Sequence, residues 1–439
     1  MPEVWLRRNP SYGVLYRSVA CPQTKGRVVA IVIALVLAAP FGAEAGGQQP
    51  STAATGVKSH ARDGYVGDDA CVRCHAKTVA SFHRTTHYLT SAEPSESSIL
   101  GKFTSGENLL KTEDPGLYFR MDEHRTDGGR PSFSETAVEG DAPNTTSQTE
   151  RIDVVIGSGE KGQTYLYWKG DKLFELPISY WTNLGWVNSP GYRDGMADFN
   201  RPIIPRCLEC HASYFESRPP PINRYSPAGY SLGIHCEVCH GPGQEHVERE
   251  GLTAVRSTAG VGAGSTSAAA SGSTDGILNP ARFSRERQMD LCAWCHAGVG
   301  WPLRPAFSYR PGDVLEKYID LPPPGPSAPP DVHGNQVGML EKSVCFRSSN
   351  MTCLTCHDVH VTQHDVAYFS AKCLTCHKPD SATFSKPNHP VTKNCVDCHM
   401  PRQNTQLIVF NFEGKRMTPQ MRNHWIKVYP ETLASVGNR

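Results

Sequence analysis

The sequence predicts a fold of mainly short α-helices and irregular chain, with a small antiparallel β insertion and a repeated cysteine motif in place of a large apolar core. Only 38% of the 439 residues are hydrophobic, whereas 34 are proline and 39 are glycine. Such a chain would build a weak core by itself. Fourteen of the 16 cysteines share one spacing that recurs seven times, so covalent staples are expected to supply stability that the core lacks.

The first 45 residues have the organisation of a secretory signal peptide. Five basic residues precede the apolar run "VVAIVIALVLAA" at 28–39, and "AEA" at 43–45 provides a small-residue cleavage site. Twelve apolar residues are too few to span a bilayer, and an uncleaved membrane anchor is the alternative interpretation. Cys21 precedes the apolar run, where a lipoprotein cysteine would not lie. We therefore expect an exported protein of the periplasm or the outer cell surface.

The repeated spacing is Cys-x-x-Cys-His, numbered below as motifs 1 to 7 in chain order. Random placement of 16 cysteines and 18 histidines in this chain would give about 0.02 copies. Two thiols three residues apart can add to the vinyl groups on one edge of a haem, and the following histidine ligates its iron. Zinc sites and thioredoxin-like pairs do not require a histidine after every CxxC. The sequence thus predicts seven covalently bound c-type haems.

Each motif is expected to supply two thioether cysteines and one proximal iron ligand. The predicted thioether residues are Cys71, Cys74, Cys207, Cys210, Cys236, Cys239, Cys292, Cys295, Cys353, Cys356, Cys373, Cys376, Cys395 and Cys398. The predicted proximal ligands are His75, His211, His240, His296, His357, His377 and His399. The porphyrins are expected to stack and to provide the apolar surface around which the chain wraps.

The motifs also suggest how the chain is divided. The expected segments are an N-terminal haem segment (46–116), a β-rich insertion (117–181), haems 2 to 4 (182–300) and a C-terminal cluster of haems 5 to 7 (301–439). "QTYLYWKGDKLFEL" at 163–176 has two aromatic and β-branched runs around Gly-Asp, which predicts a β-hairpin. The low-complexity stretch within 251–276 is expected to be a flexible insertion.

Several segments around the motifs resemble the multihaem cytochromes of the c-554/c-prime family, in particular those with doubled CxxCH motifs. "YVGDDACVRCHAKTVASFHRTTH" is similar to the opening of that family, and "CEVCHGPGQEH" matches its CExCHGPGxxH pattern. "MTCLTCHDVH" resembles MTCxxCHxPH, with Val359 in place of the usual proline. "HPVTKNCVDCHMPR" and "NHWIKV" resemble its C-terminal haem segment and its late histidine segment.

The resemblance implies that most irons have a second, distal histidine from elsewhere in the chain. The candidates are His87, His246, His333, His360, His389 and His424. His83, His235 and His364 compete for the remaining place, whereas His60 and His124 are not expected to be ligands. Gly-Pro-Gly at 241–243 is expected to end the helix after motif 3, so that His246 reaches a haem other than its own.

Three classes of function are compatible with this pattern. An electron carrier is favoured, because two histidines on every iron would leave no site for a substrate. An oxidoreductase acting on a small nitrogen or sulfur compound would need one open iron, and the lysine that replaces the motif histidine in related reductases is absent from all seven motifs. A subunit of an extracellular haem filament or of a respiratory complex is the third class.

The partners expected from these functions are other redox proteins, either cytochromes or quinol-linked membrane complexes, and a homo-oligomer is also compatible. A formal charge of +1 gives no indication of nucleic acid binding. Cys345 is the cysteine left over in the mature chain, and we expect it to be a small buried residue near a haem rather than a catalytic or pairing thiol.

Overall fold

The computed structural model describes most of the chain downstream of the predicted signal peptide. The described residues are 62–125, 129–141, 143–220, 222–258, 276–321, 331, 334–378, 394–412 and 414–433. The predicted signal peptide at 1–45, Cys21 and His60 lie outside them. No helix among the described residues is long and apolar enough to cross a membrane.

Short helices carry the cysteine motifs. Motifs 1 to 4 lie on α1 (Asp68–Phe82), α2 (Pro205–His211), α3 (Cys236–His240) and α5 (Arg285–His296). Motif 5 begins the 3₁₀-helix η4 (Cys353–Thr355), motif 6 begins at the end of α8 (Val366–Leu374), and motif 7 forms α9 (Cys395–His399). Four of these helices end at the motif histidine itself, so the imidazole stands where the chain leaves the helix. This agrees with the expected short helices.

The β structure consists of antiparallel sheets and extends on both sides of residues 117–181. A four-stranded sheet contains β2 (Leu109–Lys111), β3 (Leu117–His124), β4 (Ser132–Glu139) and β5 (Thr146–Ile152). A seven-stranded sheet contains β1 (Ser91–Ala92), β6 (Val154–Ile156), β7 (Gly162–Lys169), β8 (Lys172–Glu175), β9 (Ile178–Trp181), β10 (Gly185–Asn188) and β11 (Arg201–Pro202). Strands of two to four residues are too short to show a period in sequence, which is why the outer ones were not anticipated.

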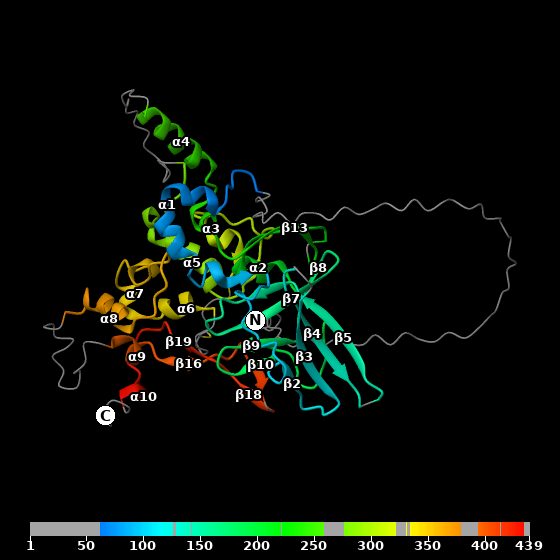
Figure 1. Cartoon of the computed structure of the whole chain (residues 1–439). Helices are drawn as coiled ribbons and strands as arrows, with labels where there is room; N and C mark the ends of the chain where they lie inside the picture. The colour runs from blue at the N-terminus through cyan, green and yellow to red at the C-terminus, as the bar shows by residue number, and fades with distance from the viewer. Residues whose placement is uncertain are drawn as a thin grey trace, which may run out of the picture. The chain divides into compact units, whose positions relative to one another are not determined.

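The predicted hairpin at 163–176 is confirmed. Strands β7 and β8 pair antiparallel, with Lys169 opposite Lys172 at the turn. Gly170 has φ of +68° in that turn, a conformation that glycine adopts without the clash of a Cβ atom. Figure 1 shows β7 and β8 beside the long strands β3, β4 and β5.

The two sheets share an apolar core. Phe119 and Phe133 of the four-stranded sheet pack with Tyr165, Ile178 and Trp186 of the other sheet, and all five are at most 4% exposed. Each such side chain contributes roughly 1.5–3 kcal/mol by leaving water. This region therefore has an ordinary protein core and does not depend on a prosthetic group for its packing.

A second core connects the β structure to motif 2. Val154, Leu166 and Leu173 of the seven-stranded sheet pack against Leu208 of α2 and against Phe215 of the next strand. That strand, β12 (Ala212–Ser217), pairs with β13 (Tyr225–Leu232), which leads directly to motif 3. The sheet thus positions the second and third motifs.

The other short elements surround the remaining motifs. They are η1 (Tyr88–Thr90), α4 (Gln244–Thr258), η2 (Pro280–Arg282), β14 (Trp301–Pro302), η3 (Leu315–Lys317), β15 (Ile319–Asp320), α6 (Gln336–Glu341), α7 (Val344–Arg347), β16 (Arg402–Asn404), β17 (Phe410–Phe412), β18 (Lys415–Met417), β19 (Gln420–Arg422) and α10 (Pro430–Leu433). Helix α4 continues to Thr258, so the first part of the predicted flexible insertion is helical, and residues 259–275 lie outside the described residues.

Candidate haem-binding sites

Histidine rings from distant parts of the chain face one another in four places. The ring centres of His75 and His246 are 6.4 Å apart, and those of His87 and His296 are 6.0 Å apart. His240 and His360 are separated by 6.0 Å, and His357 and His424 by 6.4 Å. Two imidazoles on opposite sides of one metal ion, with metal–nitrogen bonds of about 2.0 Å, have ring centres about 6 Å apart.

Each of the four pairs joins one motif histidine to one of the predicted distal candidates. The distal member always comes from another part of the chain: His246 follows motif 3 but faces motif 1, and His360 follows motif 5 but faces motif 3. Gly241, with φ of +70°, ends α3, and His246 lies in α4, as the Gly-Pro-Gly break suggested. The chain therefore crosses between haem sites rather than closing each one locally.

Buried imidazoles in these pairs are kept neutral. Burial, together with the neighbouring His296 and His357, lowers the pKa of His87 to about 4. Burial also lowers the pKa of His424 to about 4. Neutral imidazole is the form that ligates a metal, so these rings are ready to bind iron at pH 7 without first losing a proton.

The Nδ1 atoms of several motif histidines are held by oxygen atoms. His240 Nδ1 lies 2.8 Å from the Leu278 carbonyl oxygen and His399 Nδ1 lies 2.9 Å from that of Lys427. His296 Nδ1 lies 3.2 Å from Gln336 Oε1. A proton on Nδ1 leaves the Nε2 lone pair available for a metal, the second-shell arrangement of histidine ligands. The donor set and its orientation thus fit c-type haem.

Changing Gln336 to leucine should raise the potential of haem 4. Loss of the Oε1 acceptor makes the His296 imidazole less basic, which destabilises ferric iron relative to ferrous iron. The hydrogen bond is worth about 0.5–1.5 kcal/mol, so its loss can shift the haem potential by at most roughly 20–60 mV. Spectroelectrochemical titration measures the shift, and Gln336→Glu should move the same haem in the opposite direction. The control is Gln288→Leu, because Gln288 lies on α5 together with His296, and this change should not shift the potential of any haem. An equal shift in the control would contradict the role of Gln336.

Thiols of different motifs lie near one another. In each of four pairs one thiol shifts the pKa of the other: Cys71 with Cys236, Cys210 with Cys295, Cys292 with Cys353, and Cys373 with Cys395. These pairs relate motifs 1 and 3, 2 and 4, 4 and 5, and 6 and 7. The thiols of Cys239 and Cys292 interact electrostatically, as do those of Cys356 and Cys376, which relates motif 3 to motif 4 and motif 5 to motif 6.

A buried carboxylate in motif 3 holds the chain that enters motif 1. Glu237, only 3% exposed, accepts hydrogen bonds at 2.8–3.2 Å from the backbone N–H groups of Val66, Gly67 and Gly243. It is therefore fastened both to the segment before α1 and to the Gly-Pro-Gly turn. This role does not follow from the Cys-x-x-Cys-His spacing, although the place of Glu237 inside "CEVCH" was the available signal.

A second carboxylate, Asp68 of α1, also joins motif 1 to motif 3. Asp68, at the start of α1, accepts a hydrogen bond from the Cys236 backbone N–H at 3.2 Å, and its Oδ2 lies 2.8 Å from both His83 Nε2 and His235 Nδ1. His235 Nε2 lies 2.8 Å from the Leu232 carbonyl oxygen. Both ring nitrogens of His235 thus face acceptors. Its role is to tie motif 3 to α1, and no ring nitrogen is left for iron.

Asp68 and His235 stabilise each other's charged form. Burial alone would raise the pKa of Asp68, but the hydrogen bond and the charge of His235 lower it well below its usual range. Burial alone would lower the pKa of His235, but the hydrogen bond to Asp68 and the carboxylate charge raise it. His83 also stacks on Tyr88 at 3.9 Å. Two competitors for the distal position, His83 and His235, are therefore engaged in an ion-pair cluster.

Motifs 2 and 4 are joined by a buried arginine. Arg206 Nε donates to the Val299 carbonyl at 2.7 Å, Nη2 donates to the Trp294 carbonyl, and the guanidinium lies 4.6 Å from the Trp294 ring centre. Nη1 lies 3.4 Å from Glu209 Oε2, and Phe307 N–H donates to the other carboxylate oxygen at 2.6 Å. Arg206 and Glu209 are 3% and 4% exposed, so this ion pair is removed from water.

The other sequence-predicted residues lie as follows. His333 and His389 are outside the described residues. His364 is exposed, and His124 Nε2 lies 2.9 Å from Ser134 Oγ in the four-stranded sheet. Cys345 is half-buried on α7, and its thiol interacts electrostatically with Cys356 and Cys373 of motifs 5 and 6.

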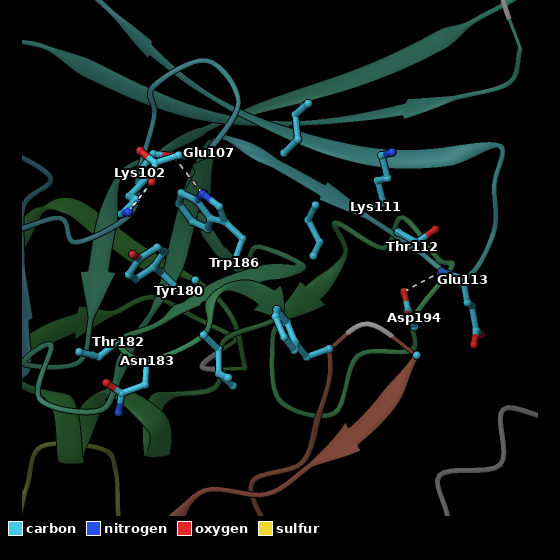
Figure 2. Close-up of a pocket in the computed structure, with 16 residues that line it drawn as sticks. Lys102, Glu107, Lys111, Thr112, Glu113, Tyr180, Thr182, Asn183, Trp186 and Asp194 are labelled. Atoms are coloured by element: carbon cyan, nitrogen blue, oxygen red, sulfur yellow. Dashed lines mark hydrogen bonds and ion pairs between the residues drawn. The ribbon is translucent and has the colours of Figure 1, made fainter.

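A separate hollow lies in the β structure. Its volume is about 750 Å³, and it is lined by β2, the β9–β10 turn and the hairpin that contains Phe412. On one side Trp186 Nε1 donates to the Lys102 carbonyl at 3.0 Å, and on the other the Glu113 N–H donates to Asp194 at 3.3 Å (Figure 2). The lining includes no motif cysteine or histidine, so the hollow is distinct from the haem-binding sites.

Comparisons with known proteins found two similarities. Residues 193–241, which include motifs 2 and 3, match the model of the family described as cytochrome c554 and c-prime. Among solved structures, the outer cell wall cytochrome OcwA aligns over 85% of this chain and 82% of its own chain, with a TM-score of 0.47 and 14% sequence identity. No curated protein matches significantly. The match over motifs 2 and 3, together with the repeated motif, shows that the chain is similar to multihaem c-type cytochromes of the cytochrome c554 and c-prime family.

Proposed function

We propose that the protein is an exported heptahaem cytochrome that transfers electrons between redox partners along closely spaced, mostly bis-histidine haems. The observation that carries this proposal is the set of four facing histidine pairs at 6.0–6.4 Å. An iron with two histidines exchanges single electrons without binding a substrate. Two-histidine coordination at these four sites therefore favours a carrier over an oxidoreductase acting on a small nitrogen or sulfur compound.

The residues have distinct roles in this proposal. The fourteen motif cysteines attach the seven haems, and the motif histidines are the proximal ligands. His246, His360, His87 and His424 serve as distal ligands for the haems of motifs 1, 3, 4 and 5 respectively. His333 and His389 are proposed for the remaining haems on the strength of the family resemblance alone.

The proximity of the motif thiols supports an order for the electron path. Thiols interact electrostatically between motifs 1 and 3, 3 and 4, 4 and 5, 5 and 6, and 6 and 7, which supports the series 1–3–4–5–6–7. Motif 2 joins the series at motif 4. Electrons would then enter and leave at motifs 1, 2 and 7, where cytochromes or quinol-linked membrane complexes would act as partners.

The location follows from the leader segment. A basic stretch, an apolar run and a small-residue cleavage site support export, and c-type haem attachment suits a protein of the periplasm or outer surface. A role as subunit of a filament or respiratory complex would require stable self-association, and a sizing column distinguishes it from a monomeric carrier.

Haem content and iron spin state test the proposal directly. The pyridine haemochrome assay on the purified protein should give seven haems per chain, and Cys236→Ser should impair attachment of one of them, whereas Cys345→Ser should leave all seven. Low-temperature EPR of the oxidised protein should be dominated by low-spin ferric signals. Fewer than four low-spin haems would contradict the histidine pairs. A high-spin signal that changes on adding nitrite, hydroxylamine or sulfite would favour the oxidoreductase.

A further inference from the structure

The surface around motif 7 combines cations, of which Arg402 and Lys427 are exposed, with aromatic rings and exposed apolar side chains. Lys342, Arg402, Arg422 and Lys427 are its cations, and these four residues are called the basic face below. We propose that the basic face is the docking surface for an acidic redox protein that exchanges electrons at haem 7. This inference rests on the proposed electron-transfer function and adds to it the partner's charge and the site of contact.

The lysines are positioned by an aromatic ring next to an iron ligand. Lys427 Nζ lies 3.8 Å from the centre of the Trp425 ring and 4.8 Å from that of Tyr429, and Lys342 Nζ lies 5.5 Å from the Trp425 ring. The backbone carbonyl of Lys427 is the partner of His399 Nδ1 at 2.9 Å. The Trp425 ring thus orients two lysines, and one of them, the exposed Lys427, contacts the proximal ligand of haem 7 through its backbone carbonyl.

The arginines lie on neighbouring strands. Arg402 on β16 and Arg422 on β19 are direct cross-strand partners, an arrangement that is destabilising for like charges. Asp397, inside motif 7, lies 2.7 Å from Arg422 Nη1 and also interacts with Arg402. One carboxylate therefore lies near two guanidinium groups, so the three side chains carry a net positive charge, and Arg402 is exposed. Figure 1 shows β16, β19, α9 and α10 together at this end of the chain.

Exposed apolar residues complete the surface. Val428 follows Lys427 and is 60% exposed, and Val344 at the start of α7 is 67% exposed. Ser343, the residue before Val344, donates through Oγ to the His424 carbonyl and accepts from the Ile426 N–H, which fastens α7 to the segment that contains the lysine. Apolar contacts beside charged groups are typical of protein interfaces, in which the charges steer and orient the encounter.

Charge is distributed unevenly along the chain and would orient such a partner. Residues 394–433 contain five basic and three acidic side chains, whereas residues 101–200 contain ten basic and sixteen acidic ones. An acidic protein is therefore attracted to the C-terminal end and repelled by the β structure. Motif 7 is also one end of the proposed series of motifs, since Cys395 lies near Cys373 of motif 6, and an electron can enter or leave there.

Reduction by an acidic protein tests the proposal. The probe is a reduced plant-type [2Fe–2S] ferredoxin, mixed with the haem-loaded protein in a stopped-flow instrument at several ionic strengths. The rate constant should fall as salt rises, and Lys342→Glu/Arg402→Glu should lower it about tenfold or more at low salt. Both substitutions leave the carbonyl that contacts His399 in place. The matched control is Lys169→Glu/Lys172→Glu on the β7–β8 turn, which has the same charge change at two exposed lysines and should stay within about twofold of the unchanged protein.

A small reductant separates this proposal from the proposed function. Reduced methyl viologen needs no protein docking surface and should reduce all three proteins equally. If methyl viologen reduces them and ferredoxin reacts equally fast with both double variants, or does not react with the unchanged protein, the basic face is not the docking surface. If methyl viologen leaves most haems oxidised, the electron-transfer function itself is wrong.

Discussion

Replacing His246 by alanine is expected to convert one haem equivalent from low spin to high spin and to leave the others unchanged. His246 faces His75 at 6.4 Å, so its loss would leave the iron of haem 1 with only the proximal imidazole. Ferric iron with one histidine is high-spin and has a vacant position for an exogenous ligand. The potential of this haem should also rise, because a basic ligand no longer stabilises ferric iron. EPR integration and cyanide or carbon monoxide titration measure the effect.

The matched control for this change is His124→Ala. His124 is hydrogen-bonded to Ser134 in the four-stranded sheet and faces no motif histidine in any of the four pairs. It should leave the spin state and the exogenous-ligand titration unchanged. An unchanged spectrum for His246→Ala, or the loss of low-spin signal from two or more haems, would show that the facing rings do not ligate one iron.

Substituting methionine for Arg206 is expected to lower the free energy of unfolding by about 3–5 kcal/mol, the range for removing one partner of a buried ion pair. The change removes the hydrogen bonds to the Val299 and Trp294 carbonyls and leaves the Glu209 carboxylate buried without its cation. Burial already raises the pKa of Glu209, while Phe307 N–H and Arg206 favour its charged form. Without Arg206 that pKa should rise further, so the loss of stability should be greater at pH 8 than at pH 5. Calorimetry at both values measures the difference.

Two further variants show whether the stability lost in Arg206→Met comes from the buried ion pair. Arg206→Met/Glu209→Gln should recover part of the lost stability, because the double change removes both charges and keeps an acceptor for Phe307 N–H. Arg224→Met breaks a more exposed pair with Asp171 and should cost at most about 1 kcal/mol. If Arg206→Met costs no more than Arg224→Met, the contact between motifs 2 and 4 does not depend on this ion pair.

Local sequence sufficed where the chemistry or the conformation is local. The thioether and proximal residues follow from a five-residue spacing, because vinyl addition and iron ligation require those atoms within one helical turn. The β7–β8 hairpin was predictable because its turn residues and its strand pattern lie within fourteen residues. The break after motif 3 was predictable because Gly241 needs a positive φ.

The sequence was less informative about residues whose role depends on distant neighbours. Glu237 and Glu209 occupy x positions of the Cys-x-x-Cys-His spacing, which does not reveal their partners. Only the folded chain brings Val66 to the first and Phe307 to the second. His235, beside motif 3, has the spacing of a ligand, yet Asp68 and the Leu232 carbonyl occupy both ring nitrogens. The outer strands of the β structure are too short to show a period, and their pairing depends on a core assembled from several strands.

The sequence by itself determined which residues can attach and ligate haem, and the family that their arrangement resembles. Only the tertiary structure decided which imidazole faces which: His246 with His75 across 171 residues, and His424 with His357 across 67. It also decided that buried charges, Asp68 and Glu237 between motifs 1 and 3 and Arg206 between motifs 2 and 4, join the motifs. The physical reason is that a motif encodes bonds within one turn of chain, whereas ring pairing and burial of charge are settled by long-range packing.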